Sequence, residues 1–357
     1  MCKNNKNLLK ISYEIDIFED LNYEYNNKYT MDFSLTEEHL LIRDAAREFA
    51  QTELLPGVIE RDNKQEFPQE LVRKMGELGF MGIMVDPKYG GSGMDTISYV
   101  LIMEELSKID ASASVMVSVN NSLVCYGLEA YGSEVQKQKY LTKLATGEYL
   151  GAFCLSEPEA GSDATSQATT AIDMGDHYII NGTKNWITNG GRSDVYLVIA
   201  QTDRAKGHRG INAFIVERGM EGFHIGPKED KLGIRGSDTH TLQFNEVKVP
   251  KENRIGEDGF GFKFAMKTLS GGRIGIAAQA LGIASGAYEL ALKYSKERKA
   301  FGTEICNHQA IAFKLADMYT EIEAARMLVM KAAWLKDQKE NYDMASAMAK
   351  LYASKVA

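Results

Sequence analysis

Hydrophobic residues recur at helical spacing in the chain after residue 30. Leu41, Ala45 and Phe49 repeat every four residues, and Pro56 ends the run. This spacing predicts a helix with the three side chains on one face, because residues four apart lie above one another on a helix. The same period predicts further helices over 96–108, 111–131 and 133–145.

A second helix in this region has clear start and stop signals. It begins at Pro68, which is tolerated in a first helical turn, and Gly79 ends it. Leu71, Met75 and Leu78 are expected to form its apolar face.

Short alternating runs replace the helical period at about residue 151. Two such runs, 177–180 and 183–188, flank Asn181-Gly182, which is the strongest short signal for a β-hairpin turn. Three more segments have the apolar and β-branched character of strands, at 195–200, 211–216 and 241–249. These patterns predict a small β domain.

The helical period returns at about residue 259. Residues 260–299 predict one very long helix, and 309–336 and the segment from 342 onward predict two more. A helix as apolar as the first must pack against others, so we expect a bundle. The helical spacing continues to Ala357 without a stop signal, and we therefore expect the bundle to be incomplete in this sequence.

The predicted fold class is a multidomain α+β protein. An all-α domain is expected over 31–150, a small central β-barrel or sandwich over 151–258, and a helical bundle, truncated, over 259–357. Residues 1–30 have no clean periodicity, and we interpret them as a disordered extension or a mis-set start.

Composition excludes several classes of protein. The formal net charge of −8 argues against a nucleic-acid partner, because proteins that bind nucleic acid usually have a basic face and none stands out in this sequence. The four cysteines and six histidines have no metal-ligand spacing, so we expect reduced thiols and no metal. No apolar run reaches the roughly 18 residues of a membrane span. The acids at the N-terminus argue against a transit peptide and no secretion signal is present, so a cytoplasmic protein is expected.

Two stretches carry candidate chemistry. One is Cys154-Leu-Ser-Glu-Pro-Glu-Ala-Gly-Ser-Asp163, and the other is Asn181-Gly-Thr-Lys-Asn-Trp-Ile-Thr-Asn-Gly-Gly191. They combine an aromatic residue, hydroxyl groups and glycine turns, which suit a wide cofactor ring with a pyrophosphate tail. Taken singly, Trp186 is equally well read as a cross-strand packing residue and Gly161 as a plain turn.

Together the two stretches resemble the flavin-binding segments of the acyl-CoA dehydrogenase family. The resemblance covers nearly all of 31–357 and is closest to short-chain, butyryl-type enzymes. Its other parts are Ser118-Val-Asn-Asn-Ser-Leu123, Lys228-Glu-Asp-Lys-Leu-Gly233, Val247-Lys-Val-Pro250, Gly271-Gly-Arg-Ile-Gly-Ile-Ala277 and Arg298-Lys-Ala-Phe-Gly302. It implies FAD-dependent α,β-dehydrogenation of short-chain acyl-CoA thioesters, electron transfer to an electron-transferring flavoprotein, and a homotetramer.

The resemblance also implies roles for individual residues around FAD. Trp186 should lie against the flavin face away from substrate, and Thr188 should reach the N5 region. Where relatives often have Thr, this chain has Ser156, which keeps the hydroxyl. Arg298 and Gln309 should hold the FAD of a neighbouring subunit, although without the resemblance they read as a solvated charge and a surface amide. The full expected cofactor set is Phe153, Leu155, Ser156, Gly161, Ser162, Trp186, Ile187, Thr188, Arg298 and Gln309.

For the substrate, the resemblance implies contacts to acyl-CoA from Ser162, Ser270, Gly271, Gly272 and Arg273. The general base is a Glu that most family members place beyond the position of Ala357 and a minority place immediately before the arginine matching Arg273. That position is Gly272 here, so the base is expected beyond residue 357 and no residue of this chain is assigned to it.

Two alternatives stay open at this point. The first is an acyl-CoA oxidase or flavin monooxygenase on the same fold, which would use oxygen directly. The second is an inactive acyl-CoA-binding protein or helical scaffold, because no catalytic base is assigned within the sequence.

Overall fold

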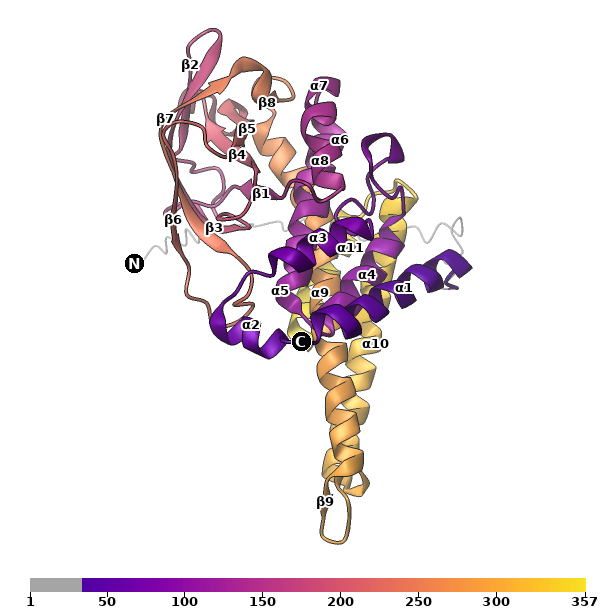
Figure 1. The fold of residues 1–357 in the computed structure, drawn as a ribbon. Helices are drawn as coiled ribbons and strands as arrows, with labels where there is room; N and C mark the ends of the chain where they lie inside the picture. Colours follow the sequence, from indigo (N-terminus) through magenta and orange to yellow (C-terminus); the bar gives the residue numbers. More distant parts are fainter. Residues whose placement is uncertain (1–33) are drawn as a thin grey trace, which may run out of the picture. The chain divides into compact units, whose positions relative to one another are not determined.

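The computed structural model describes residues 34–357, and nearly all of these belong to one compact unit, Glu37–Ala357. Within that unit, helices precede and follow a central sheet (Figure 1). The mixed α+β class and the helix, sheet, helix order predicted from the sequence are confirmed. The interpretation of residues 1–30 as a disordered extension or a mis-set start concerns residues outside the described part of the chain.

The first helical region is built from short, interrupted helices. They are α1 (Glu37–Phe49), α2 (Val58–Lys64), α3 (Gln69–Glu77), α4 (Thr96–Ser107), α5 (Ala111–Ser118), α6 (Tyr126–Tyr131), α7 (Glu134–Gln136) and α8 (Thr142–Ala145). Wider π-helical turns join several of them, notably η4 (Val119–Cys125) between α5 and α6. The predicted helices over 96–108, 111–131 and 133–145 are therefore present.

Two of the predicted apolar faces were partly wrong. In α1 the buried side chains are His39, Ala46 and Phe49, whereas Leu41 and Ala45 are exposed. In the helix after Pro68, Met75 is buried but Leu78 is exposed. In α1 the strict four-residue repeat drifts around a helix of 3.6 residues per turn, which explains the error there. In the second helix Leu78 lies just after the last residue of α3, Glu77.

The central strands form one mixed sheet. The strands are β1 (Gly151–Cys154), β2 (Thr170–Asp173), β3 (His177–Thr188), β4 (Val195–Gln201), β5 (Ile211–Glu217), β6 (Phe223–Lys228), β7 (Thr239–Pro250) and β8 (Arg254–Ile255). Their order is β6-β7-β3-β2-β4-β5-β8, with β1 paired in parallel to β4. The predicted strands at 195–200, 211–216 and 241–249 lie within β4, β5 and β7.

The predicted hairpin turn at Asn181-Gly182 was wrong, because β3 runs without interruption from His177 to Thr188. The chain turns earlier, between β2 and β3, where Met174 donates to the His177 carbonyl. Asn181 lies opposite a bulge in β7 instead, and its side-chain oxygen accepts from the Glu246 amide at 2.8 Å. Gly182 allows close packing, since a Cβ there would lie 2.4 Å from Thr169 Oγ1.

Strands β4 and β5 are buried on both faces. One set of alternating side chains, including Leu197 and Ile215, joins a cluster with Phe264 of α9 and Leu144 of α8. The other set, including Tyr196 and Phe214, packs against β3 and β7. The rings of Tyr178 and Phe214 meet edge to face across this second cluster, 4.8 Å apart. This double burial explains why β4 and β5 read as continuous apolar runs.

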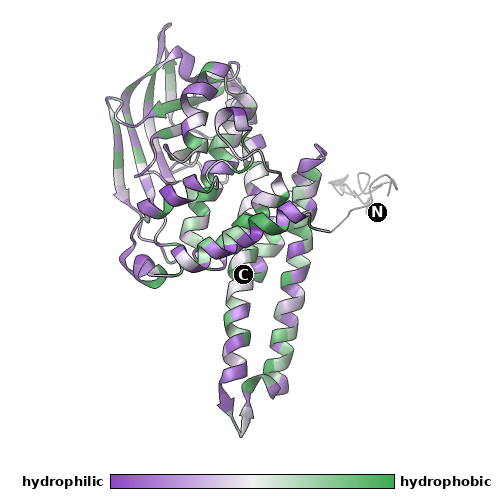
Figure 2. Cartoon of the chain, turned by 45° about the vertical axis from the view of Figure 1, so that its right-hand side comes forward, coloured by the Kyte–Doolittle hydropathy of each residue, from purple (hydrophilic) through white to green (hydrophobic). Residues whose placement is uncertain are grey.

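The last region is dominated by three helices, α9 (Gly261–Glu297), α10 (Gln309–Asp337) and α11 (Asp343–Val356), which agree closely with the predicted segments. The lower parts of α9 and α10 form a hairpin whose tip carries β9 (Lys299–Ala300) and β10 (Thr303–Glu304) (Figure 1). Figure 2 shows hydrophilic and hydrophobic residues intermixed along this hairpin. Its exposed apolar residues include Leu290, Phe301 and Phe313.

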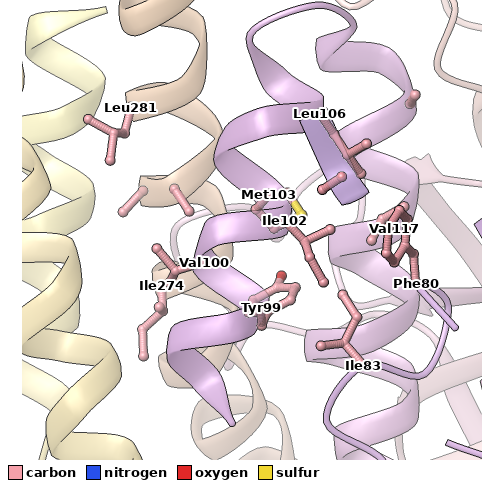
Figure 3. Close-up of a cluster of buried hydrophobic side chains, with 14 of the residues drawn as sticks. Phe80, Ile83, Tyr99, Val100, Ile102, Met103, Leu106, Val117, Ile274 and Leu281 are labelled. Atoms are coloured by element: carbon pink, nitrogen blue, oxygen red, sulfur yellow. The ribbon is translucent and has the colours of Figure 1, made fainter. Parts of the chain in front are cut away.

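The upper half of α9 is the spine of the helical core. Its residues Ile274 and Leu281 pack against Tyr99, Val100 and Met103 of α4 (Figure 3). By length and composition α9 is the one described helix that could cross a membrane, but 61% of its apolar window is buried inside the protein. That burial is typical of a core helix, and it gives no clear sign of a membrane span.

Candidate functional site

The first flavin-like stretch leaves the sheet at the end of β1 and turns back on itself. Phe153 is buried in β1, and its ring stacks on that of Phe264 of α9 with centroids 6.2 Å apart. Glu157 and Ala160 exchange backbone hydrogen bonds and close a turn around Pro158. Gly161 and Ser162 follow on the exposed side of this turn, and a Cβ on Gly161 would meet nothing within 4 Å.

The second stretch lies beside the first. The Asn185 amide donates to the Ser156 carbonyl at 2.8 Å, which places Trp186 next to the turn after β1. Between Lys184 and Ile187, strand β3 has one more residue than its partner β7, and Trp186 lies in this bulge with φ of 60°. A tryptophan in the left-handed region is strained, because its Cβ crowds the following carbonyl.

The strained backbone presents Trp186 outward instead of burying it. Its side chain is 61% exposed, whereas Ile187, the next residue, is buried in the sheet core. The structure therefore contradicts the reading of Trp186 as a cross-strand packing residue. A bulge that turns a large aromatic residue toward solvent is a feature that functional sites often use.

None of the four side-chain hydroxyl groups in these stretches has a hydrogen-bond partner among residues 34–357. They belong to Ser156, Thr183 and Thr188, which are half-buried, and to Ser162, which is exposed. Free hydroxyls beside an exposed aromatic ring match what a flavin needs, since its ring edge carries several acceptors and one donor. The residues of the two stretches thus fit a flavin.

A buried ion pair, which sequence reasoning missed, holds the two stretches together. The Lys184 ammonium donates to Glu157 Oε1 at 2.7 Å, to the Leu155 carbonyl at 3.0 Å and to Gln167 Oε1 at 2.5 Å. Glu157 in turn accepts from the backbone amide of Thr169. These contacts fix the carbonyl just before Ser156 and tie three chain segments into one rigid unit.

Together, burial and pairing lower the pKa values of both Lys184 and Glu157. Burial lowers the pKa of Lys184 to about 8, although the attraction of Glu157 opposes the shift. Burial alone would raise the pKa of Glu157, but Lys184 and the hydrogen bonds from Thr169 and Ala168 outweigh it and hold the pKa below its usual value. Both residues stand within the two stretches that the sequence singled out, and only their partnership was hidden.

An apolar cavity lies on the helical side of the same region. Its volume is about 200 Å³, and it is lined by Ser118, Val119, Ser122, Leu123, Leu269, Gly272, Arg273, Ile276 and Lys350. The buried cluster that contains Phe153 and Leu155 also contains Val119, with Leu123 and Leu269 packed against it. The first flavin-like stretch, through Leu155, and the cavity thus adjoin the same cluster, whereas Ile187 of the second stretch belongs to the cluster on the other face of the sheet.

Two of the five expected substrate residues line this cavity on α9, whereas Ser270, Gly271 and Ser162 are not among its lining residues. Gly272 and Arg273 line it, and Ser270 accepts a hydrogen bond from Arg273 Nη1 at 3.2 Å. A Cβ on Gly272 would lie 2.7 Å from Leu123 Cδ2, so this position has no room for a carboxylate side chain unless Leu123 moves. None of the residues that line the cavity carries a carboxylate.

Arg298 and Gln309 are not brought to this site. Both are exposed near the tip of the α9–α10 hairpin, away from the sheet (Figure 1). Within residues 34–357, no group of three or more His, Cys, Asp or Glu side chains is arranged to hold a metal ion.

Comparison with known proteins gives three matches to models of one family. The models describe the N-terminal domain of acyl-CoA dehydrogenase over residues 36–148, its middle domain over 152–247 and its C-terminal domain over 259–357. The chain belongs to the acyl-CoA dehydrogenase family. The resemblance identified from the two flavin-like stretches is therefore confirmed.

Individual relatives within the acyl-CoA dehydrogenase family are similar over almost the whole chain. The short-chain specific acyl-CoA dehydrogenase of Clostridium acetobutylicum is 52% identical over 327 residues, which are 92% of this chain and 86% of the relative. The structure of butyryl-CoA dehydrogenase from Megasphaera elsdenii is 49% identical with a TM-score of 0.90, covering 92% of this chain and 86% of the other.

A second solved structure connects the family to an electron-transfer protein. It is a chain in the structure of the electron transferring flavoprotein of Acidaminococcus fermentans, and it is 53% identical with a TM-score of 0.91. The match covers 92% of this chain and 86% of that chain.

Proposed function

We propose that this chain binds FAD and catalyses α,β-dehydrogenation of short-chain acyl-CoA thioesters to trans-2-enoyl-CoA. The observation that carries the proposal is that Ser156, whose hydroxyl is free among the described residues, directly follows Leu155 of the buried cluster that also borders the apolar cavity on α9, and that the exposed Trp186 lies beside Ser156. When bound, FAD supplies an acceptor for the hydride that leaves the β carbon. High identity to short-chain enzymes supports the substrate class.

The residues of the β region orient the cofactor in this proposal. Trp186 covers one face of the ring, and the hydroxyls of Ser156 and Thr188 hydrogen-bond to its polar edge. Lys184 does not contact the cofactor in this proposal. It positions Ser156, because its ammonium donates to the Leu155 carbonyl and fixes the turn that carries Ser156. Phe153, Leu155, Gly161, Ser162 and Ile187 complete the proposed set of cofactor contacts within the chain.

The α9 residues hold the substrate. The cavity wall is mainly apolar and suits a short hydrocarbon tail, which gains by leaving water. Ser270, Gly271, Gly272 and Arg273 border the thioester in this arrangement, and Ser162 contacts the pantetheine or phosphate portion. The group that accepts the α proton is not assigned to a described residue.

The proposal includes two kinds of protein partner. An electron-transferring flavoprotein receives the electrons, which is supported by the match to a chain in a structure of such a protein. Arg298 and Gln309 contact the FAD of a neighbouring copy in a homotetramer, which accounts for the place of these residues at the tip of the α9–α10 hairpin, away from the sheet (Figure 1). We place the enzyme in the cytoplasm and in fatty acid β-oxidation.

Anaerobic mixing of the FAD-loaded protein with butyryl-CoA tests the proposal. The long-wavelength flavin absorption should bleach and crotonyl-CoA should form in equal amount. A protein that binds FAD but is not reduced by any short-chain acyl-CoA would contradict the proposed activity. Rapid reoxidation of the reduced protein by oxygen alone would favour an oxidase instead.

A further inference from the structure

Helix α9 approaches α4 closely at two glycines, Gly275 and Gly282, and the first of them faces Tyr99. A Cβ on Gly275 would lie 2.1 Å from the hydroxyl oxygen of Tyr99 and 2.7 Å from Ser118 Oγ. Real side chains never approach so closely, so any residue larger than glycine at position 275 is incompatible with the present placement of Tyr99. The phenol of Tyr99 occupies the space that a side chain on α9 would otherwise fill.

Tyr99 is held firmly in this space. It is among the largest fully buried side chains, and it lies on α4 in the cluster that includes Ile274 of α9 (Figure 3). Its hydroxyl donates a hydrogen bond to Ser118 Oγ at 3.0 Å. Burial raises the pKa of Tyr99, so the phenol stays neutral and keeps its proton for this bond.

The partner of Tyr99 is a wall residue of the apolar cavity. Ser118 and Ser122 line the cavity and are almost fully buried, so they mark its inner end. The charged lining residues Arg273 and Lys350 are more exposed and mark the end nearest solvent. An acyl tail that enters past Arg273 therefore points toward Ser118. Tyr99 does not itself line the cavity, but its hydroxyl lies 3.0 Å from Ser118 Oγ and supports this wall residue.

We propose that Tyr99, accommodated by Gly275, closes the inner end of the acyl cavity and so determines the maximum acyl chain length. This inference rests on the proposed function, because it takes the cavity to hold the acyl tail. A longer tail has to displace a buried, hydrogen-bonded phenol, and close packing leaves the phenol no other position. A four-carbon tail reaches the wall without disturbing it.

Binding measurements test this role independently of turnover. The dissociation constants of butyryl-CoA and octanoyl-CoA are measured by calorimetry for the FAD-loaded wild-type chain and for Tyr99→Leu, which shortens the wall but preserves apolar packing. Tyr99→Leu should tighten octanoyl-CoA binding by about tenfold or more, because extra methylenes become buried, and should leave butyryl-CoA within about threefold. Tyr99→Phe is the matched control, since it keeps the ring, and it should retain the wild-type preference for butyryl-CoA.

The possible results separate the two claims. If Tyr99→Leu has a native near-UV circular dichroism spectrum and an unchanged ratio of octanoyl-CoA to butyryl-CoA affinity, the role of Tyr99 is wrong while the proposed function stands. If the wild-type chain binds FAD but no acyl-CoA, the proposed function fails and this inference fails with it. If Tyr99→Leu does not fold, Tyr99→Met, which fills more of the space with a flexible side chain, replaces it. A shift of the affinity ratio toward octanoyl-CoA in this folded variant supports the ring as the wall, whereas an unchanged ratio overturns it.

Discussion

The Lys184 ammonium and the Glu157 carboxylate form a buried ion pair at 2.7 Å, with side-chain exposures of 0% and 1%. The two residues come from the two separate stretches that carry the candidate flavin contacts. Their pairing explains why these stretches occur together in one chain, because neither charge is stable in this environment without the other.

Removing one partner of this pair should destabilise the protein strongly. Lys184→Met leaves Glu157 buried without its cation, and the free energy of unfolding should fall by roughly 3–5 kcal/mol. Urea denaturation followed by circular dichroism measures this change. FAD affinity should fall as well, because the Leu155 carbonyl loses its hydrogen bond to Lys184.

The double variant Lys184→Met with Glu157→Gln is the control. It removes both charges, so it should recover a substantial part of the lost stability. If the double variant is less stable than Lys184→Met by the full cost of a second independent substitution, the two residues do not act as a pair.

The strained backbone at Trp186 predicts opposite effects on stability and binding. In Trp186→Gly, the free energy of unfolding should stay unchanged or rise by about 1 kcal/mol, because glycine adopts positive φ without strain. FAD should bind about threefold to tenfold more weakly, because an aromatic contact is lost. Thermal unfolding and fluorescence titration with FAD measure the two effects. Trp186→Phe should bind FAD more tightly than Trp186→Gly, and equal affinities would remove the assigned role of Trp186.

Lys336 predicts a pH-dependent contribution to stability. Its ammonium contacts Met84 Sδ at 3.5 Å and lies over the Tyr126 ring. Burial lowers the pKa of Lys336 to about 8 from its ordinary 10.5. Below about pH 8 both the folded and unfolded states hold the proton, so the cost of burying the charge is present in full. As the pH rises from about 8 to 10.5 the folded state releases the proton first, and this cost disappears.

Lys336→Met should therefore be more stable than the wild type at neutral pH, by about 1–3 kcal/mol given the partial exposure of the side chain. The advantage should shrink steadily between about pH 8 and 10.5. Urea denaturation of both proteins across this range provides the measurement. An advantage that grows with pH would show that the assigned direction of the pKa shift is wrong.

Two neighbouring glycines on α9 provide a matched pair. Gly272→Ala should destabilise the protein by about 1–3 kcal/mol, because its Cβ would lie 2.7 Å from Leu123 Cδ2. Gly271→Ala should be neutral or stabilising by up to about 1 kcal/mol, since its nearest neighbour is the Tyr342 hydroxyl at 3.8 Å and alanine favours helices. Equal effects at the two positions, measured by thermal unfolding, would contradict the close packing of α9 on η4.

The sequence predicted where the helices and strands of this fold lie better than it predicted which side of each helix is buried. Helix α9 was recognisable because its apolar period runs unbroken for many turns. In α1 we expected Ala45 on the buried face, but its neighbour Ala46 is buried instead. Both are plausible core residues until the neighbouring helices are known. Helix α2 was not predicted, since none of its side chains is buried and it has no apolar face to read.

Long-range contacts account for the remaining differences. Asn181-Gly182 has the composition of a turn, but here Asn181 satisfies a bulge in a strand more than 60 residues away. The partnership of Lys184 with Glu157 and the placement of Tyr99 against Gly275 likewise depend on segments distant in sequence. Motif resemblance singled out the two candidate flavin stretches, but it contains no information on which polar residues pair between them.

A crystal structure of the chain with FAD and butyryl-CoA tests the central claim most directly. It should show the flavin ring against Trp186 with the hydroxyls of Ser156 and Thr188 at its edge, and the butyryl tail in the cavity beside Gly272 with its terminal carbon toward Ser118. A flavin bound elsewhere, or a butyryl tail outside this cavity, would contradict the account.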